Sequence, residues 1–447
     1  MNQTKENLKK ISGLAIPLIL SQIGQVFVTL ADNAMVGHAG KEYLAASSFA
    51  NSVFMMILMF GMGITFGLTP LVGKSYGQKE YGYIQKLFHN SIFLNLTISV
   101  ILMIVGVVVG LCMPFMGQPE HVVALAQPYY YILLISVLPL LHFFSIKQFA
   151  EGMENTKLAM ILTVTGNILN IIGNYILIYG KFGAPQLYLN GAGISTLISR
   201  IFMMVGFIYV FKTKSVFENF SLSFSFKEIE WKIQKRLLGI GSSIGLQMLI
   251  EAVIFSVGAI MMGWVGELYL ASHQIAVSLS YFTFMIANGI AQATTIRIST
   301  LYGQKDLLQL NTTIKLSFII TLCYSTLCCI MFYVLARPLA AIFTNEMEVI
   351  AEAAALIGMA AIYQIFDGLQ VLGIGVLRGF ADVKRPMIYA AASYLLVGIP
   401  GGYICTFTLG MGARGIWVGF IIGLGSAAVL FWARTYKRMK VLGGQLA

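Results

Sequence analysis

Three acidic residues, Asp32, Glu251 and Asp367, lie within long apolar stretches of the sequence, whereas the rest of its 18 acidic residues fall in polar segments or at the ends of apolar runs. A charge at the centre of a bilayer costs at least about 2.5 kcal/mol on the lenient insertion scale, so such residues need a reason. Two desolvated carboxylates become tolerable when they take up a proton or bind a small cation. Either event would be a coupling step.

The segment Tyr363-Gln-Ile-Phe-Asp367 places a phenol and a carboxylate one helical turn apart on a shared face. Together with Glu251 they offer hard oxygen ligands of the kind that small cations prefer. In the structural alternative, each acid is neutralised by a local partner such as Arg200 or faces a water-filled cleft.

Asparagines form a second polar group, because Asn167, Asn170 and Asn174 follow one another at spacings of three and four. This spacing predicts one polar face on an otherwise apolar helix. The face would either complete a hydrogen-bond network around Asp32 or act as interhelical glue, which is a common role of Asn in membranes.

Composition predicts that these residues are held by membrane-spanning helices. The 447 residues are 58% hydrophobic and 11% charged, whereas roughly 25% of a typical soluble domain is charged. Apolar runs that reach the roughly 20 helical residues needed to cross a bilayer recur twelve times. We therefore predict an all-α integral membrane protein with twelve transmembrane helices. The predicted spans lie near 11–36, 48–70, 88–113, 125–149, 159–180, 190–211, 237–262, 272–295, 313–336, 351–376, 386–408 and 414–435.

The first half of the sequence is repeated in the second. From Gly13 against Gly239 onward the offset is constant at 226 residues, with about 18 identical pairs among 67. A second match pairs Gly152 with Gly379 at an offset of 227. Two homologous six-helix bundles follow, and such duplication is common in secondary transporters. The predicted division is an N-terminal bundle at 1–211, a cytoplasmic linker at 212–236 and a C-terminal bundle at 237–447.

The repeat also relates the acids of the first and seventh spans. Glu251 aligns with Gln25, and Asp32 follows Gln25 by seven residues, or about two helical turns, on nearly the same face. The bundles are thus related but chemically unequal. Pro17 is expected to loosen or kink the first span because it lacks an amide donor and its ring clashes with the preceding turn; a tolerated membrane proline is the alternative.

Basic residues predict the orientation. Of the 29 Lys and Arg, 24 fall in the termini and in loops after even-numbered spans, so the positive-inside rule places both termini in the cytoplasm. The net charge of +11 is therefore mainly a topology signal. No basic folded domain is expected, and hence no nucleic-acid partner.

Several separated motifs, in order along the whole chain, resemble the multidrug and toxic compound extrusion (MATE) family, and in particular its bacterial NorM-like branch. They are Pro17 to Gln22, Asp32 to His38, Tyr179 to Pro185 before Gly191 to Gly193, and Tyr363 to Asp367 with Leu377 to Gly379. The resemblance implies export of small cationic amphipathic compounds through a cleft between the bundles, driven by inward flow of Na⁺ or H⁺. We also expect a multi-pass protein of the bacterial cytoplasmic membrane, surrounded by lipid, that needs no cofactor. It is expected to function as a monomer, because one chain supplies both halves of the cleft.

Site residues follow from the same resemblance. In NorM-like members the C-terminal cation site maps onto Glu251, Tyr363 and Asp367. The N-terminal site of the family maps onto Asp32, Asn170 and Asn174. A DinF-like branch relies on the N-terminal Asp and on proton-driven bending of the first span, and it lacks the C-terminal acidic pair. That pair is present here and favours the NorM-like branch, whereas Asp32 and Pro17 keep proton coupling open.

Two other functional classes are weighed against this one. A lipid-linked oligosaccharide flippase of the same superfamily would share the duplicated bundles, but its pyrophosphate ligand calls for a strongly cationic cavity. Arg200 is the one basic residue that we assign deep within a span, which argues against a flippase. An intramembrane enzyme or receptor is the third class, but neither a metalloprotease motif nor a nucleophile elbow nor a phosphate-binding loop stands out, so we expect no enzymatic activity.

Overall fold

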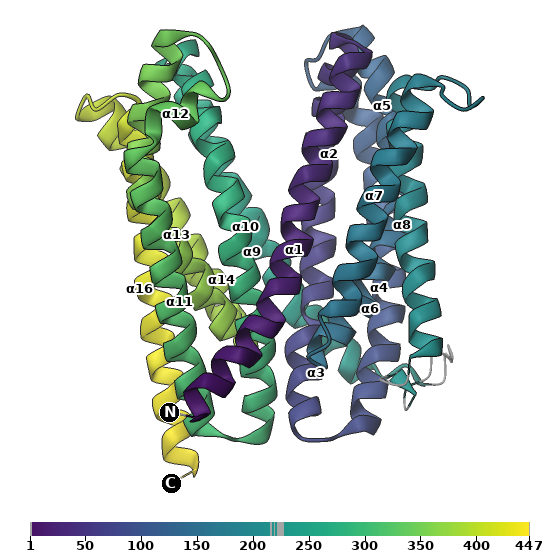
Figure 1. Ribbon diagram of the computed structural model, residues 1–447, viewed down its shortest axis with the longest axis vertical. Helices are drawn as coiled ribbons and strands as arrows, with labels where there is room; N and C mark the ends of the chain where they lie inside the picture. Colours follow the sequence, from purple (N-terminus) through teal and green to yellow (C-terminus); the bar gives the residue numbers. More distant parts are fainter. Residues whose placement is uncertain (1, 215–216, 219, 221–227, 447) are drawn as a thin grey trace. The chain divides into compact units, whose positions relative to one another are not determined.

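The computed structural model describes residues 2–214, 217–218, 220 and 228–446, and this part of the chain is built from helices (Figure 1). In chain order they are α1 (Asn2–Ala39), α2 (Lys41–Phe66), α3 (Leu68–Gly77), α4 (Tyr81–Cys112), η1 (Met113–Phe115), α5 (Glu120–Ile135), α6 (Val137–Gly152), α7 (Lys157–Tyr179), α8 (Tyr188–Thr213), α9 (Trp231–Val265), α10 (Glu267–Gln304), α11 (Leu307–Val334), α12 (Ala336–Ala341), α13 (Met347–Gly379), α14 (Lys384–Ala391), η4 (Ala392–Gly398), α15 (Ile399–Tyr403), η5 (Ile404–Thr408) and α16 (Ala413–Leu446).

The predicted number of spans is confirmed within the described residues, where 12 helical segments are long and apolar enough to cross a membrane. Helix is the expected backbone because it satisfies its own N–H and C=O groups where lipid offers no partners. Most segments extend beyond the apolar runs read from the sequence. The tenth, for example, covers Met347–Gly379 instead of 351–376, because the helix continues through Glu348 at one end and Arg378 at the other.

The duplication recurs in the backbone. Residues with positive φ mark equivalent turns in the two halves, although only glycine adopts such angles without strain. Three pairs are related by the repeat offsets: Gly40 (φ 154°) with Gly266 (151°), Lys79 (60°) with Lys305 (59°), and Glu154 (61°) with Ala381 (54°). The two halves therefore share turn geometry as well as sequence.

The chain forms two compact units. One comprises Met1–Ile19 and Leu246–Ala447, and the other Leu20–Gly245. Helices α1 and α9 therefore each contribute to both units. The predicted bundle boundaries remain a prediction, and much of the predicted linker at 212–236 lies outside the described residues.

In the Leu20–Gly245 unit, α7 packs against α8, α2 against α5, and α4 against α6. The first part of α9 joins this unit through a seam of glycines. A Cβ on Gly63 of α2 would lie 2.1 Å from the Gly245 Cα, and one on Gly67 would lie 2.9 Å from the Gly241 nitrogen. Backbone contacts this close require small residues, as in many membrane helix pairs.

In the other unit, α13 packs against α10, α11 and α16 (Figure 1). The first part of α1 belongs to this unit, where Ala15 shares a buried apolar cluster with Ala293 of α10. These two positions are the repeat equivalents of Gly241 and Gly67. Each half of the chain thus repeats the same small-residue contact.

The eleventh span is not a regular α-helix, because π-helical segments η4 and η5 flank the short α15. Pro400 at the start of α15 cannot donate a backbone hydrogen bond, which favours such irregularity. The backbone of Gly398 lies against Gly423 of α16. Within η4, Tyr394 is 1% exposed and points into the interior of its unit.

The residues just before α9 are anchored on α4. His89 pairs with Glu228, and Lys86 Nζ lies 2.7 Å from Glu230 Oε1. The side chain of Asn90 donates to the Glu228 carbonyl at 3.2 Å and accepts from the Glu230 amide at 2.9 Å. This anchor fixes where α9 begins.

The glycine seam predicts that Gly63→Ala destabilises the protein, because the new methyl group would meet the backbone of Gly245, which cannot move aside as a side chain can. Overpacking of this kind costs about 1–3 kcal/mol. We expect a melting temperature several degrees below wild type in detergent. The matched control is Gly82→Ala, where a Cβ meets nothing within 4 Å. Equal melting temperatures for the two variants would contradict the claim that the contact between Gly63 and Gly245 requires glycine.

Candidate functional site

Two of the intramembrane acids lie in the unit that contains α13. Asp367 is 3% exposed, and its Oδ1 accepts a hydrogen bond of 3.3 Å from the hydroxyl of Tyr363. An electrostatic interaction joins Asp367 with Glu251 of α9. The structure therefore brings together the three residues from which the sequence predicts a cation site. Their role in binding a cation stays a prediction.

Asp367 keeps an unused acceptor. Its Oδ2 is buried and has no hydrogen-bond partner within the described part of the chain. A buried carboxylate oxygen without a donor is unfavourable, and a bound cation or proton would relieve that cost.

Aromatic contacts hold the Tyr363 ring. The rings of Tyr363 and Trp417 meet edge to face with centroids 5.6 Å apart, and Phe255 lies at 6.5 Å on another side. Tyr363 is 4% exposed. Because packing fixes the ring, the hydroxyl of Tyr363 is held against Asp367.

Glu251 is surrounded by amide donors. Its Oε1 accepts from Gln370 at 3.1 Å and from Gln247 at 3.3 Å. Gln370 also contacts the Tyr394 hydroxyl at 2.6 Å. Arg378, in the last turn of α13, donates to Gln247 at 3.5 Å and interacts electrostatically with Glu251.

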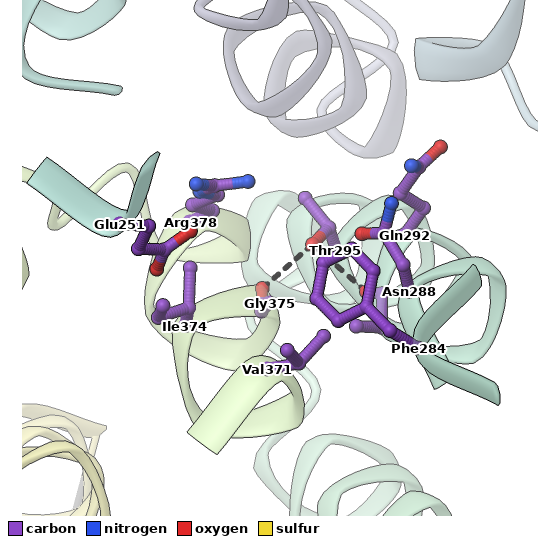
Figure 2. Close-up of a pocket in the computed structure, with 10 residues that line it drawn as sticks. Glu251, Phe284, Asn288, Gln292, Thr295, Val371, Ile374, Gly375 and Arg378 are labelled. Carbon is purple, nitrogen blue, oxygen red and sulfur yellow. Dashed lines mark hydrogen bonds between the residues drawn. The ribbon is translucent and has the colours of Figure 1, made fainter. Parts of the chain in front are cut away.

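A small cavity of about 40 Å³ opens beside Glu251 and Arg378 (Figure 2). Its other side carries Asn288, Gln292 and Thr295 of α10. A volume of this size accommodates a few waters or a small cation, because one water needs about 10–15 Å³ on such a measure. It is too small for a drug-sized molecule, whose sites span about 300–1,000 Å³.

Sequence reasoning missed four members of this cluster. Gln247 precedes Glu251 by one helical turn, and Gln370 follows Asp367 by three residues, so helical spacing offered a signal for both. Arg378 was placed in a loop because the apolar run ends before it. Tyr394 had no local signal, since its contact with Gln370 depends on how η4 packs.

The third acid, Asp32, lies in the other unit and meets the predicted asparagines of α7. Asn174, which is fully buried, donates its amide to Asp32 Oδ1. In the orientation that satisfies its hydrogen bonds, the amide nitrogen of Asn170 donates to the same Asp32 oxygen at 3.0 Å. Its amide oxygen then accepts from Thr196 Oγ1 at 3.2 Å. The structure thus brings these three residues together, while their coupling or substrate role stays a prediction.

Arg200 of α8 has identifiable partners. It donates to the hydroxyl of Ser136, and its guanidinium lies over the Phe54 ring at 5.5 Å from the centroid. It also interacts electrostatically with Asp32. Arg200 is thus held by Ser136 and Phe54, and neutralisation of Asp32 by Arg200 remains the alternative to a coupling role.

Gln25 and Pro17 lie elsewhere on α1. Gln25 is exposed, and its carbonyl accepts from the Thr29 hydroxyl at 3.0 Å. Pro17 is buried within the uninterrupted α1, two residues before Ile19, the last residue that this part of α1 contributes to its unit. The proposed roles of Gln25 and Pro17 remain predictions.

Arg200 is not the sole basic residue deep within a span. Arg297 of α10 is 4% exposed and Lys147 of α6 is 9% exposed. Both have side-chain partners, since Arg297 donates to Gln309 at 3.0 Å and Lys147 lies 3.7 Å from Glu151. Arg378 of α13 also lines the small cavity, where Glu251 lies in the same wall, so the argument against a cationic cavity rests on the partners of these basic groups rather than on their scarcity.

Comparison with known proteins identifies relatives along nearly the whole chain. The sequence model of the MatE family matches residues 17–176 and 243–404. The probable multidrug resistance protein NorM of Photorhabdus laumondii is 32% identical over 429 residues, covering 95% of this chain and 94% of that protein. The multidrug resistance protein MdtK of Yersinia pseudotuberculosis is 31% identical over 433 residues, with 95% and 94% covered.

Solved structures share the fold. An outward-facing multidrug resistance MATE family transporter of the MOP superfamily superimposes with a TM-score of 0.90 at 22% identity, covering 98% of this chain and 97% of that one. The eukaryotic MATE transporter AtDTX14 superimposes with a TM-score of 0.87 at 18% identity, covering 100% of both chains. The predicted architecture of two homologous six-helix bundles is confirmed by this likeness.

The Asp32 network predicts energetic coupling between Asp32 and Asn174. Asn174→Ala leaves a partly buried carboxylate short of a donor, so its cost should be smaller in an Asp32→Asn background. A double-mutant cycle, read by reversible unfolding in mixed micelles, should give a coupling of about 0.5–3 kcal/mol. Strictly additive losses would show that the contact contributes nothing.

Proposed function

The chain belongs to the MatE family, and from that premise we propose that it is a secondary active multidrug efflux antiporter. It exports small cationic amphipathic compounds in exchange for Na⁺ or H⁺ by alternating access. The multidrug resistance proteins NorM and MdtK, which resemble it over most of its length, support multidrug efflux. The interaction of the two acids Glu251 and Asp367 supports the exchange.

The observation that carries this proposal is that Glu251 and Asp367, which interact electrostatically, lie around one polar cluster that also contains Tyr363 and Gln370. Two interacting carboxylates in a low-dielectric setting repel each other, so their site gains free energy when a cation or proton enters. The phenol of Tyr363 and the free Oδ2 of Asp367 supply further oxygen ligands. Hard cations prefer oxygen ligands, so carboxylate, phenol and amide oxygens are the ligands proposed for Na⁺.

Exchange requires that the cation and the drug favour different conformations or compete for one site, because a ligand with equal affinity for both states shifts nothing. We propose that cation entry at Glu251 and Asp367 favours the conformation that has released the drug. Asp32, hydrogen-bonded to Asn174 and Asn170, is proposed as the second coupling or substrate group. Its different partners fit a role distinct from that of the C-terminal acids.

The predicted topology completes the proposal. Basic residues concentrate in the termini and in the loops after even-numbered spans, so both termini face the cytoplasm of a bacterial cell. Because one chain supplies both units, the monomer is the proposed functional form.

Transport is tested by reconstituting the purified protein in liposomes and following ethidium movement under an imposed Na⁺ gradient, an imposed pH gradient, or neither. Choline chloride balances ionic strength, and protein-free liposomes give the leak. Movement under a Na⁺ gradient alone would support a cation site at Glu251 and Asp367. Movement under a pH gradient alone would support protonation and make Asp32 the first residue to substitute. A folded protein that moves no dye under any gradient would overturn the proposal.

Asp367→Asn should abolish gradient-driven ethidium movement while leaving the protein folded in the membrane, because the amide removes the charge that binds the cation. The ethidium movement that remains should be close to the leak of protein-free liposomes. Glu348→Gln is the matched control, since it removes an exposed carboxylate from the first turn of the same helix and should transport like wild type. Full transport by Asp367→Asn would refute the assignment of Asp367.

A further inference from the structure

Helix α13 carries a base as well as an acid that faces the candidate cation site. Arg378 follows Asp367 by eleven residues, or about 16 Å along the helix at 1.5 Å per residue. Gln370 lies between them, and its amide reaches Glu251. One helix therefore carries Asp367, Gln370 and Arg378, and all three interact with Glu251.

The guanidinium is linked to Glu251 through an intervening amide. Arg378 Nη2 donates to Gln247 Oε1 at 3.5 Å, and Gln247 Nε2 donates to Glu251 Oε1 at 3.3 Å. The Nε of Arg378 is buried without a hydrogen-bond partner in the part of the chain that the structure describes. Figure 2 shows the guanidinium beside the Glu251 carboxylate. Arg378 thus retains donor capacity close to a carboxylate that it interacts with electrostatically.

Glu251 and Arg378 border the same small cavity, so a cation that enters it meets both the carboxylate and the guanidinium. A guanidinium also keeps its charge at physiological pH, and its planar fork matches a carboxylate. Any cation that binds Glu251 must therefore compete with, or share the carboxylate with, a permanent positive charge.

We propose that Arg378 is a positioning residue for the coupling step: a tethered cation that neutralises Glu251 when the site is empty and lowers its affinity for the coupling cation. This inference rests on the proposed exchange function. A transported ion must bind well enough to enter but weakly enough to leave. Without Arg378, Glu251 and Asp367 would hold the cation too tightly for rapid release.

Arg378→Gln tests the proposal in the liposome assay, with dye movement measured against the concentration of the driving cation, Na⁺ or H⁺. We expect the half-saturating cation concentration to fall at least about tenfold, equivalent to 1.4 kcal/mol, and the maximal rate to fall as well. Arg378→Lys keeps the charge, so its half-saturating cation concentration should stay near that of the wild type. Arg385→Gln, which removes an exposed charge from α14, is the matched control and should behave as wild type.

A merely structural role of Arg378 would lower the yield of folded protein and the maximal rate without changing the half-saturating concentration, and that result would overturn the inference. An unchanged Arg378→Gln variant would overturn it too. Both outcomes leave the exchange function intact, because the wild type still moves dye under a cation gradient. If the wild type moves no dye under either gradient, the proposed function fails, and this inference fails with it.

Discussion

The cost of holding carboxylates in an apolar environment is the constraint on which the described polar architecture depends. A charged side chain at the centre of a bilayer is unfavourable by at least about 2.5 kcal/mol. In one unit, amides from Gln247 and Gln370 meet Glu251, while Tyr363 meets Asp367. In the other, Asn174 donates to Asp32. These contacts offset part of the cost and leave acceptor capacity at Asp367 for a cation.

The duplication gave both halves the same scaffold but not the same chemistry. Turn residues with positive φ recur at equivalent positions, and so does the close contact between small residues of two helices. The repeat equivalent of Asp32 is Gly258, where an added Cβ would lie 2.3 Å from the Phe420 ring. A carboxylate has no room there. The equivalent of Glu251, Gln25, is exposed on α1. Each half therefore carries its own polar site on a shared backbone plan.

Local sequence patterns are sufficient to predict the helices and to single out the acids that lie within them. Apolar runs determined the spans because hydrocarbon surroundings leave the backbone no alternative to helix, and the same runs made Asp32, Glu251 and Asp367 conspicuous. Helix ends were less predictable, and Arg378 was misplaced in a loop for that reason. The contact of Tyr394 with Gln370 was beyond sequence reasoning, because it depends on where tertiary packing places the π-helical η4. The hydrogen bonds of Asn174 and Gln370 to the acids depend in the same way on packing between distant helices.

Release of the bound cation by a drug is the most direct test of the central claim that Glu251 and Asp367 hold the exchanged cation. The measurement would follow Na⁺ and H⁺ released from purified protein in detergent when ethidium is added, in the wild type and in a Glu251→Gln, Asp367→Asn double variant. The account predicts cation release from the wild type in proportion to the dye bound, and none from the double variant. Dye binding by the wild type without cation release, or equal release from both proteins, would contradict it.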